Sequence, residues 1–179
     1  MQAATIALAG MVLGNAALYF VLYSLAKSSW AAGNAARMSI VFWLSLMCAG
    51  NVWSYVPIRA LTTHADIALA ARGFGVSTWV QFPFVLVPAL FVVWHFFQRM
   101  CARSFVIIAG ESSAKVAFLV AVTSYWFFVF FVGDAVGGDY GTVSLVMAII
   151  SKYLLFPLAT IWLWQRYGAR AKSGHAPYL

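Results

Sequence analysis

The sequence predicts an all-α fold, a polytopic integral membrane bundle of five transmembrane helices in a single domain. Hydrophobic residues make up 64% of the 179 residues and charged residues only 8%, whereas a soluble domain has about 25% charged residues. The apolar residues also fall into five runs. Each run is close to the roughly 20 residues with which an α-helix crosses the hydrocarbon core of a bilayer.

The five spans are expected at residues 3–26, 38–56, 78–97, 115–132 and 143–164. The first is too long for the core of a signal peptide and no basic segment precedes it, which favours a retained helix. Pro57 suits the end of the second span, because proline disfavours a helical residue before it. Pro83 and Pro88 predict a bend in the third. Residues 62–72 are expected to form a short helix on the outer surface, and residues 165–179 a basic cytoplasmic tail.

The basic residues orient this topology. If the N-terminus lies outside, eight of the eleven lysines and arginines fall on the inner side, namely Lys27, Arg37, Arg99, Arg103, Lys115, Arg166, Arg170 and Lys172. Arg59 and Arg72 fall outside, and Lys152 lies within the last span. Basic residues concentrate on the cytoplasmic side of membrane proteins. We therefore expect the inner membrane of a bacterium, with an outer N-terminus and a cytoplasmic C-terminus.

Aromatic residues are placed by the same topology. Trp53 and Trp79 are expected at the outer boundary of the membrane, within an aromatic belt. The run from Trp126 to Phe131 is expected to face lipid, pigment or helices of other proteins.

Lys152 is the residue that does not fit a simple anchor. A charged side chain at the middle of a bilayer costs about 2.5–3.5 kcal/mol on insertion scales. By position in the spans it is expected level with Asn15, Ser124 and Tyr125, as an intramembrane polar layer. Such a layer orients helices through hydrogen bonds. The alternatives are a relay for protons or substrate, a docking point for a partner's carboxylate or a lipid headgroup, and a side chain that extends along the helix to the membrane surface.

The histidines and their neighbours are candidate contacts for a cofactor or a partner. His95 lies in the inner half of the third span, and either forms an interfacial hydrogen bond or is a single axial ligand of haem or chlorophyll. His64 is in the outer loop, so the two histidines cannot share one haem. His64 and Asp66 form a polar cluster, either a solvated surface helix with local ion pairs or a docking site.

Several chemistries lack their motifs in this sequence. Zinc needs three or four converging ligands, and no H-E-x-x-H is present. No serine lies in a Gly-x-Ser-x-Gly context, so we expect no catalytic residue and no metal. The basic residues are spread over the ends of the apolar runs, which argues against a nucleic-acid partner. Cys48 and Cys101 are expected to be free thiols at different depths.

One stretch carries a resemblance to a known family. Asn51-Val52-Trp53-Ser54-Tyr55-Val56-Pro57-Ile58, preceded by Ala9-Gly10 and Asn15 in the first span, resembles the second half of a site-2-protease-like membrane core. Members of that family place an Ala-Gly/Asn element on one helix, and a later asparagine leads into a proline and a zinc-binding Asp-Gly. Here isoleucine follows Asp66, and the H-E-x-x-H helix is missing. The resemblance therefore implies a degenerate, non-catalytic relative, and no metal ligand is carried over.

Three functions remain as hypotheses. The first is a non-catalytic subunit that packs in and stabilises a larger membrane complex of the respiratory or photosynthetic type. Its partners would be membrane lipids and other membrane subunits, with lipid or pigment as a possible contact. The second is a small transporter or lipid-handling protein that uses buried Lys152 and the paired prolines. The third is the degenerate protease-like protein.

Overall fold

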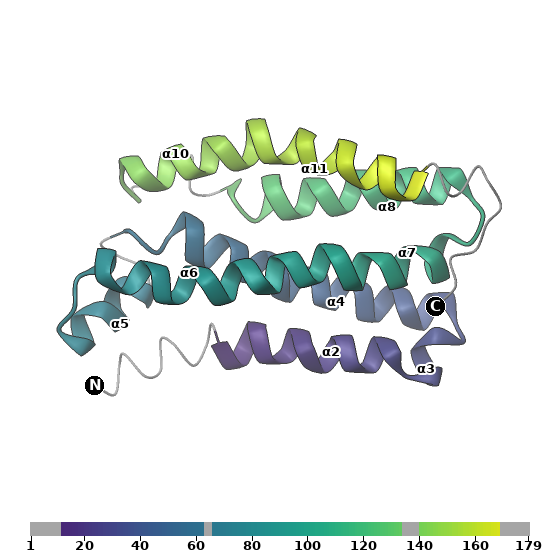
Figure 1. Ribbon diagram of the computed structural model, residues 1–179, viewed down its shortest axis with the longest axis horizontal. Coiled ribbons are helices and arrows are strands. Elements are labelled where there is room, and N and C mark those ends of the chain that lie inside the picture. The colour runs from purple at the N-terminus through teal and green to yellow at the C-terminus, as the bar shows by residue number, and fades with distance from the viewer. Residues whose placement is uncertain (1–11, 63–65, 134–139, 169–179) are drawn as a thin grey trace.

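The computed structural model describes residues 12–62, 66–133 and 140–168, and within these ranges its regular structure is entirely helical (Figure 1). The prediction of an all-α fold is confirmed. Four helices in the described ranges are long and apolar enough to cross a membrane, namely Ala35–Ile58, Thr78–Ala109, Ser113–Phe130 and Thr142–Gly168. The first expected span, residues 3–26, lies partly outside the described residues.

The described part of the first span is helical and packs along the second span. The π-helical η1 (Val12–Ala17) and α2 (Leu18–Lys27) follow one another and run beside α4 (Ala35–Trp53). The short α3 (Ser29–Ala32) joins the two. Asn34 begins α4 because its Oδ1 accepts hydrogen bonds from the backbone N–H groups of Ala36 at 2.9 Å and Arg37 at 3.1 Å. These bonds satisfy donors that a helix start leaves open.

The second span ends in a π-helical segment, η2 (Ser54–Ile58), which contains Pro57. The helix thus ends two residues beyond the expected 56. The surface helix also differs from its expected bounds of 62–72, because α5 runs from Asp66 to Phe74. Gly75 ends it with a φ of +69°, a left-handed conformation that glycine adopts at low cost.

The third span is longer than the sequence suggests. α6 (Thr78–His95), η3 (Phe96–Met100) and α7 (Cys101–Ala109) form one helix of 32 residues, where a span of 78–97 was expected. The last turns stay helical because one face is buried against α4 and α8 at helical spacing, with Met100, Cys101, Ser104 and Phe105 inside. The helix stops at Gly110, whose φ is +55°.

The last two spans form a hairpin. α8 (Ser113–Tyr125) continues as η4 (Trp126–Phe130), and the fifth span consists of α10 (Thr142–Ile150), η5 (Ser151–Leu155), α11 (Phe156–Leu163) and η6 (Trp164–Gly168). Ser112 begins α8 by accepting a hydrogen bond from the backbone of Lys115. The final helix includes residues 165–168, which were expected in the tail. Figure 1 shows α10 and α11 beside α8, with α6 and α4 between this hairpin and α2.

Stacked aromatic rings fill the centre of the bundle. The ring of Phe42 stacks on Phe96 with centroids 5.8 Å apart, and Phe96 stacks on Phe127 at 5.7 Å. Phe97 stacks on Phe128 at 5.6 Å. These rings come from α4, η3 and η4, so one aromatic core joins three spans. The expectation that the run from Trp126 to Phe131 faces outward is wrong for Phe127 and Phe128, which are buried; consecutive helical residues point in different directions.

Candidate functional site

A layer of hydrogen bonds crosses the bundle at the level of Asn51 and Trp53 on α4. Nδ2 of Asn51 donates to Oδ1 of Asn15 across 3.2 Å, which ties η1 to α4. Nε1 of Trp53 donates to Oγ of Ser151 across 3.2 Å, and Ser151 donates in turn to the carbonyl of Phe128 across 3.0 Å. Four helical segments are therefore joined within about one turn of α4.

Trp53 is thus part of the bundle interior. It was expected at the outer membrane boundary, but its ring is buried against Phe127 and Phe128 with centroids 6.1 and 5.8 Å away. The indole can be buried because Ser151 accepts its N–H proton, as buried tryptophans require. The expected place in a lipid-facing aromatic belt is therefore wrong: Trp53 packs inside the bundle and joins α4 to the last hairpin.

Lys152 follows Ser151 directly and lies at the edge of this layer. Its side chain is half-buried, and the next two residues, Tyr153 and Leu154, are exposed. The helix that carries it, Thr142–Gly168, is the least buried of the four candidate spans. Among the described residues no hydrogen bond or ion pair of Lys152 is found. Lys152 therefore lies between the buried face that carries Ser151 and the exposed face that carries Tyr153.

The other expected members of the polar layer take different positions. Asn15 is bonded to Asn51. Ser124 is fully buried, and its Oγ and that of neighbouring Thr123 have no hydrogen-bond partner among the described residues. Tyr125 is about half exposed and contacts the ring of Phe156 edge-on. The structure does not join Lys152 to Asn15, Ser124 or Tyr125.

His95 lies in a second polar contact, on the other side of the bundle. The hydroxyl of Tyr19 on α2 is 2.6 Å from Nδ1 of His95 on α6. Tyr19 is fully buried, and His95 is its hydrogen-bond partner. The buried phenol proton of Tyr19 needs an acceptor, and Nδ1 of His95 is in place to accept it. With Tyr19 as the donor, the imidazole proton is on Nε2. Ligation of a haem iron through Nε2 would require the opposite tautomer and would leave the buried phenol proton unpaired.

Aromatic rings surround this histidine. The ring of Tyr23 lies edge-on with its centroid 4.5 Å from that of His95. Further ring contacts come from Phe20 at 5.5 Å and Phe91 at 6.0 Å. This cage fixes the imidazole in one orientation, as Tyr19 fixes its tautomer. The interaction that remains available to the imidazole of His95 is donation of a hydrogen bond from Nε2.

His95 and Asn15 were predicted as candidate residues from the sequence, whereas their partners Tyr19 and Asn51 were not. Polar residues inside apolar runs were the available signal, and Tyr19, His95, Asn15 and Asn51 all share it. His64 lies outside the described residues. Asp66 begins α5, on the far side of α6 from the Lys152 helix in Figure 1. In the described ranges, no three histidine, cysteine, aspartate or glutamate side chains are grouped so as to hold a metal ion.

Comparisons of this chain with protein-family models, with curated proteins and with solved structures find no match.

Proposed function

We propose that this chain is a non-catalytic, five-span subunit that packs in a larger complex of a bacterial inner membrane. One observation carries the proposal: Lys152 is half-buried on the least buried span, beside a hydrogen-bonded layer. A cation in the hydrocarbon region costs about 2.5–3.5 kcal/mol. A carboxylate on a neighbouring subunit offsets this cost, because charges within a membrane pair with one another.

The surface of the same helix supports this use. Its outward residues are large and apolar, with Tyr153, Leu154, Leu158 and Ile161 each more than half exposed. Such side chains contact lipid or pack against a second helix through van der Waals contact. Successive helical residues are about 100° apart, so Lys152 lies next to Tyr153 and on a different face from Leu154, Leu158 and Ile161. The contact proposed is therefore at the edge of the exposed face, where a partner helix meets Tyr153 and forms one ion pair with Lys152.

The positions of the basic residues support the orientation. Lys27 ends α2, Arg37 lies in the first turn of α4, and Lys115 lies in the first turn of α8. These three termini lie at the same end of the bundle in Figure 1. Arg59 and Arg72 lie at the other end, after η2 and in α5. The end with more basic residues is the cytoplasmic end, so the N-terminus is outside and the C-terminus is inside.

The test is the mass of the native particle after gentle detergent extraction, for the unaltered chain and for Lys152→Met. We expect the unaltered chain in a particle with other subunits and the variant released from it. The released variant should fold at least as stably, because an unpaired charge has been replaced by an apolar side chain. Lys115→Met, at an exposed position, is the matched control and should stay assembled.

Two outcomes would contradict the proposal. One is an unaltered particle that contains this chain alone, and the other is a Lys152→Met variant that assembles normally. Orientation is tested separately by labelling single cysteines at Val76 and Ser112 in a chain without its native thiols. Val76→Cys should react from outside and Ser112→Cys from the cytoplasm.

A further inference from the structure

A pocket lies between α5 and the start of α6. Its volume is about 300 Å³, and it is lined by Phe74, Val76, Val80, Gln81, Phe84 and Val85. This volume is at the lower end of the range for small-molecule sites in proteins, about 300–1,000 Å³. Its wall residues Val80 and Phe84 are exposed, so the pocket opens toward the surroundings of the bundle.

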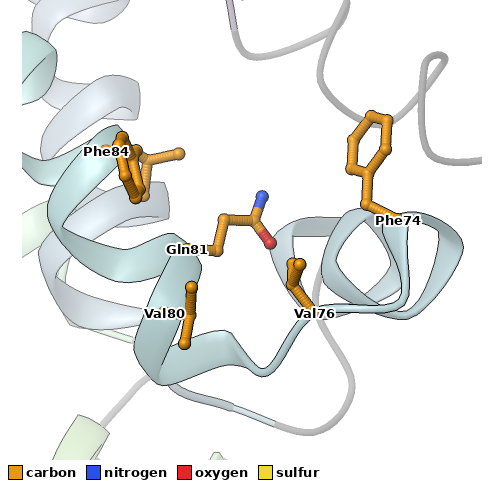
Figure 2. Close-up of a pocket in the computed structure, with 6 residues that line it drawn as sticks. Phe74, Val76, Val80, Gln81 and Phe84 are labelled. Atoms are coloured by element: carbon orange, nitrogen blue, oxygen red, sulfur yellow. The ribbon is translucent and has the colours of Figure 1, made fainter.

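Gln81 is the polar residue of this apolar pocket. Figure 2 shows its side chain extending from α6 into the space between this helix and the segment that carries Phe74 and Val76. The residue is 9% exposed, and its Oε1 has no hydrogen-bond partner among the described residues. A buried amide oxygen without a partner is destabilising, because the group has given up its hydrogen bonds to water. Oε1 is covered in the structure as it stands, so a molecule that fills the pocket gains this one hydrogen-bond acceptor when the amide of Gln81 turns toward it.

The occupant must bring a hydrogen-bond donor attached to an apolar body. A phosphate diester has acceptors only, so it can accept from Nε2 of Gln81 but leaves Oε1 unpaired. An ammonium group donates, but its charge would be transferred into a pocket whose other walls are valine and phenylalanine, which is costly. A neutral hydroxyl donates without that cost.

The position of Gln81 fits the same class of molecule. It is three residues after Thr78, the first residue of α6, which is about one helical turn. Because it lies near the end of a membrane span, its amide is close to the boundary between hydrocarbon and headgroups. The hydroxyl of a neutral lipid lies at that boundary while its chain extends into the hydrocarbon.

We propose that the pocket between α5 and α6 binds a neutral membrane lipid through its hydroxyl, which donates to Oε1 of Gln81 while Phe74, Val80 and Phe84 enclose the adjoining chain. This site is separate from Lys152 and does not depend on the chain being a subunit of a complex.

The experiment uses a hexadecanol that carries a photoactivatable diazirine on its chain, and the methyl ether of the same molecule as the matched control. Both are bound to the full-length chain in lipid nanodiscs, irradiated, and the crosslinked residues identified by mass spectrometry. The alcohol should label the pocket residues about threefold to tenfold more than the ether, since only the alcohol donates. Gln81→Leu should reduce labelling by the alcohol to the level of the ether.

A second pair of variants tests the pocket without changing the amide. Val80→Phe fills the pocket and should reduce labelling by both probes. Val87→Phe is the control, at a somewhat more exposed position on α6 outside the pocket, and should leave labelling unchanged. Equal labelling by the alcohol and the ether overturns the hydrogen bond to Gln81. Labelling spread evenly over the bundle surface, or unaffected by Val80→Phe, overturns the site.

Discussion

Trp53 and Ser151 are 98 positions apart in the sequence and share a hydrogen bond of 3.2 Å from the indole nitrogen to the serine oxygen. Ser151 also donates to the backbone carbonyl of Phe128 at 3.0 Å. One hydroxyl group therefore fixes the positions of α4, η4 and η5 relative to one another. The contact is fully buried, so water does not replace it when it is lost.

Replacing Ser151 by alanine should destabilise the bundle by about 0.6–2 kcal/mol, the range measured for hydrogen bonds between membrane helices. Equilibrium unfolding in mixed micelles gives the value. The control is Ser39→Ala, because Ser39 is only partly buried and donates to the carbonyl of Ala35 in its own helix, at the surface of the bundle. If both variants lose the same stability, the bond between helices contributes nothing.

Replacing Tyr19 by phenylalanine should change the tautomer of His95. In the unaltered chain the Tyr19 hydroxyl, 2.6 Å from Nδ1, holds the proton on Nε2. Without it the two tautomers become closer in free energy, and nitrogen NMR of the imidazole should report a mixture. Tyr23→Phe is the control, since Tyr23 contacts His95 through its ring. An unchanged spectrum for Tyr19→Phe would show that the hydroxyl does not set the tautomer.

Replacing Gly50 by alanine should destabilise the bundle by about 1–3 kcal/mol, the usual cost of overpacking. An added Cβ at Gly50 would overlap the ring of Phe131. The loss should be smaller in a chain that also carries Phe131→Leu, which frees the space. Gly133→Ala is the control, because a Cβ there meets no atom within 4 Å. Thermal unfolding in detergent separates the three variants, and equal losses at Gly50 and Gly133 would refute the overlap.

Replacing Arg103 by lysine should cost about 1 kcal/mol of stability. Nε of Arg103 donates to the carbonyl of Ala26 across 2.7 Å, and Nη2 is 3.4 Å from the carbonyl of Lys27. The guanidinium thus closes the end of α2 with two donors, which a lysine does not reproduce. Arg99→Lys, at an exposed position one turn earlier, should be neutral in the same unfolding measurement. Comparable losses of stability in the two variants would show that any exchange of arginine for lysine has this effect, and that the bonds to Ala26 and Lys27 contribute nothing.

The helices were predictable because apolar runs of sufficient length have one stable form in a bilayer. Their contacts were not. Hydropathy gives the approximate depth of Asn15 and Asn51 but not the rotation of their helices, and the hydrogen bond between them depends on both. The same limit explains why the environment of Trp53 was not predicted. A tryptophan near the end of an apolar run can face lipid or pack inside the bundle, and only the contact with Ser151 shows that it is inside.

The amino-acid composition of a span also does not show which face of its helix is buried and which is exposed. The run from Trp126 to Phe131 is uniformly aromatic, so it has no polar residue to mark the outward side. Packing against Phe96 and Phe97 selects Phe127 and Phe128 for the interior. The pocket at Gln81 was missed for a related reason, because α5 and α6 create it only when they lie side by side.

The unequal lengths of the candidate spans have a consequence for the surrounding bilayer. Ser113–Phe130 has 18 residues and Thr78–Ala109 has 32, which correspond to about 27 Å and 48 Å. A hydrocarbon core of about 30 Å matches the shorter helix. The last turns of the longer helix do not stand free, because Met100, Cys101 and Phe105 are buried against α4 and α8. In a bilayer the difference in length therefore falls on the lipid and on the tilt of the helices: the lipid beside the longer helix thickens or the whole bundle tilts, at a fraction of a kcal/mol for each Å of mismatch.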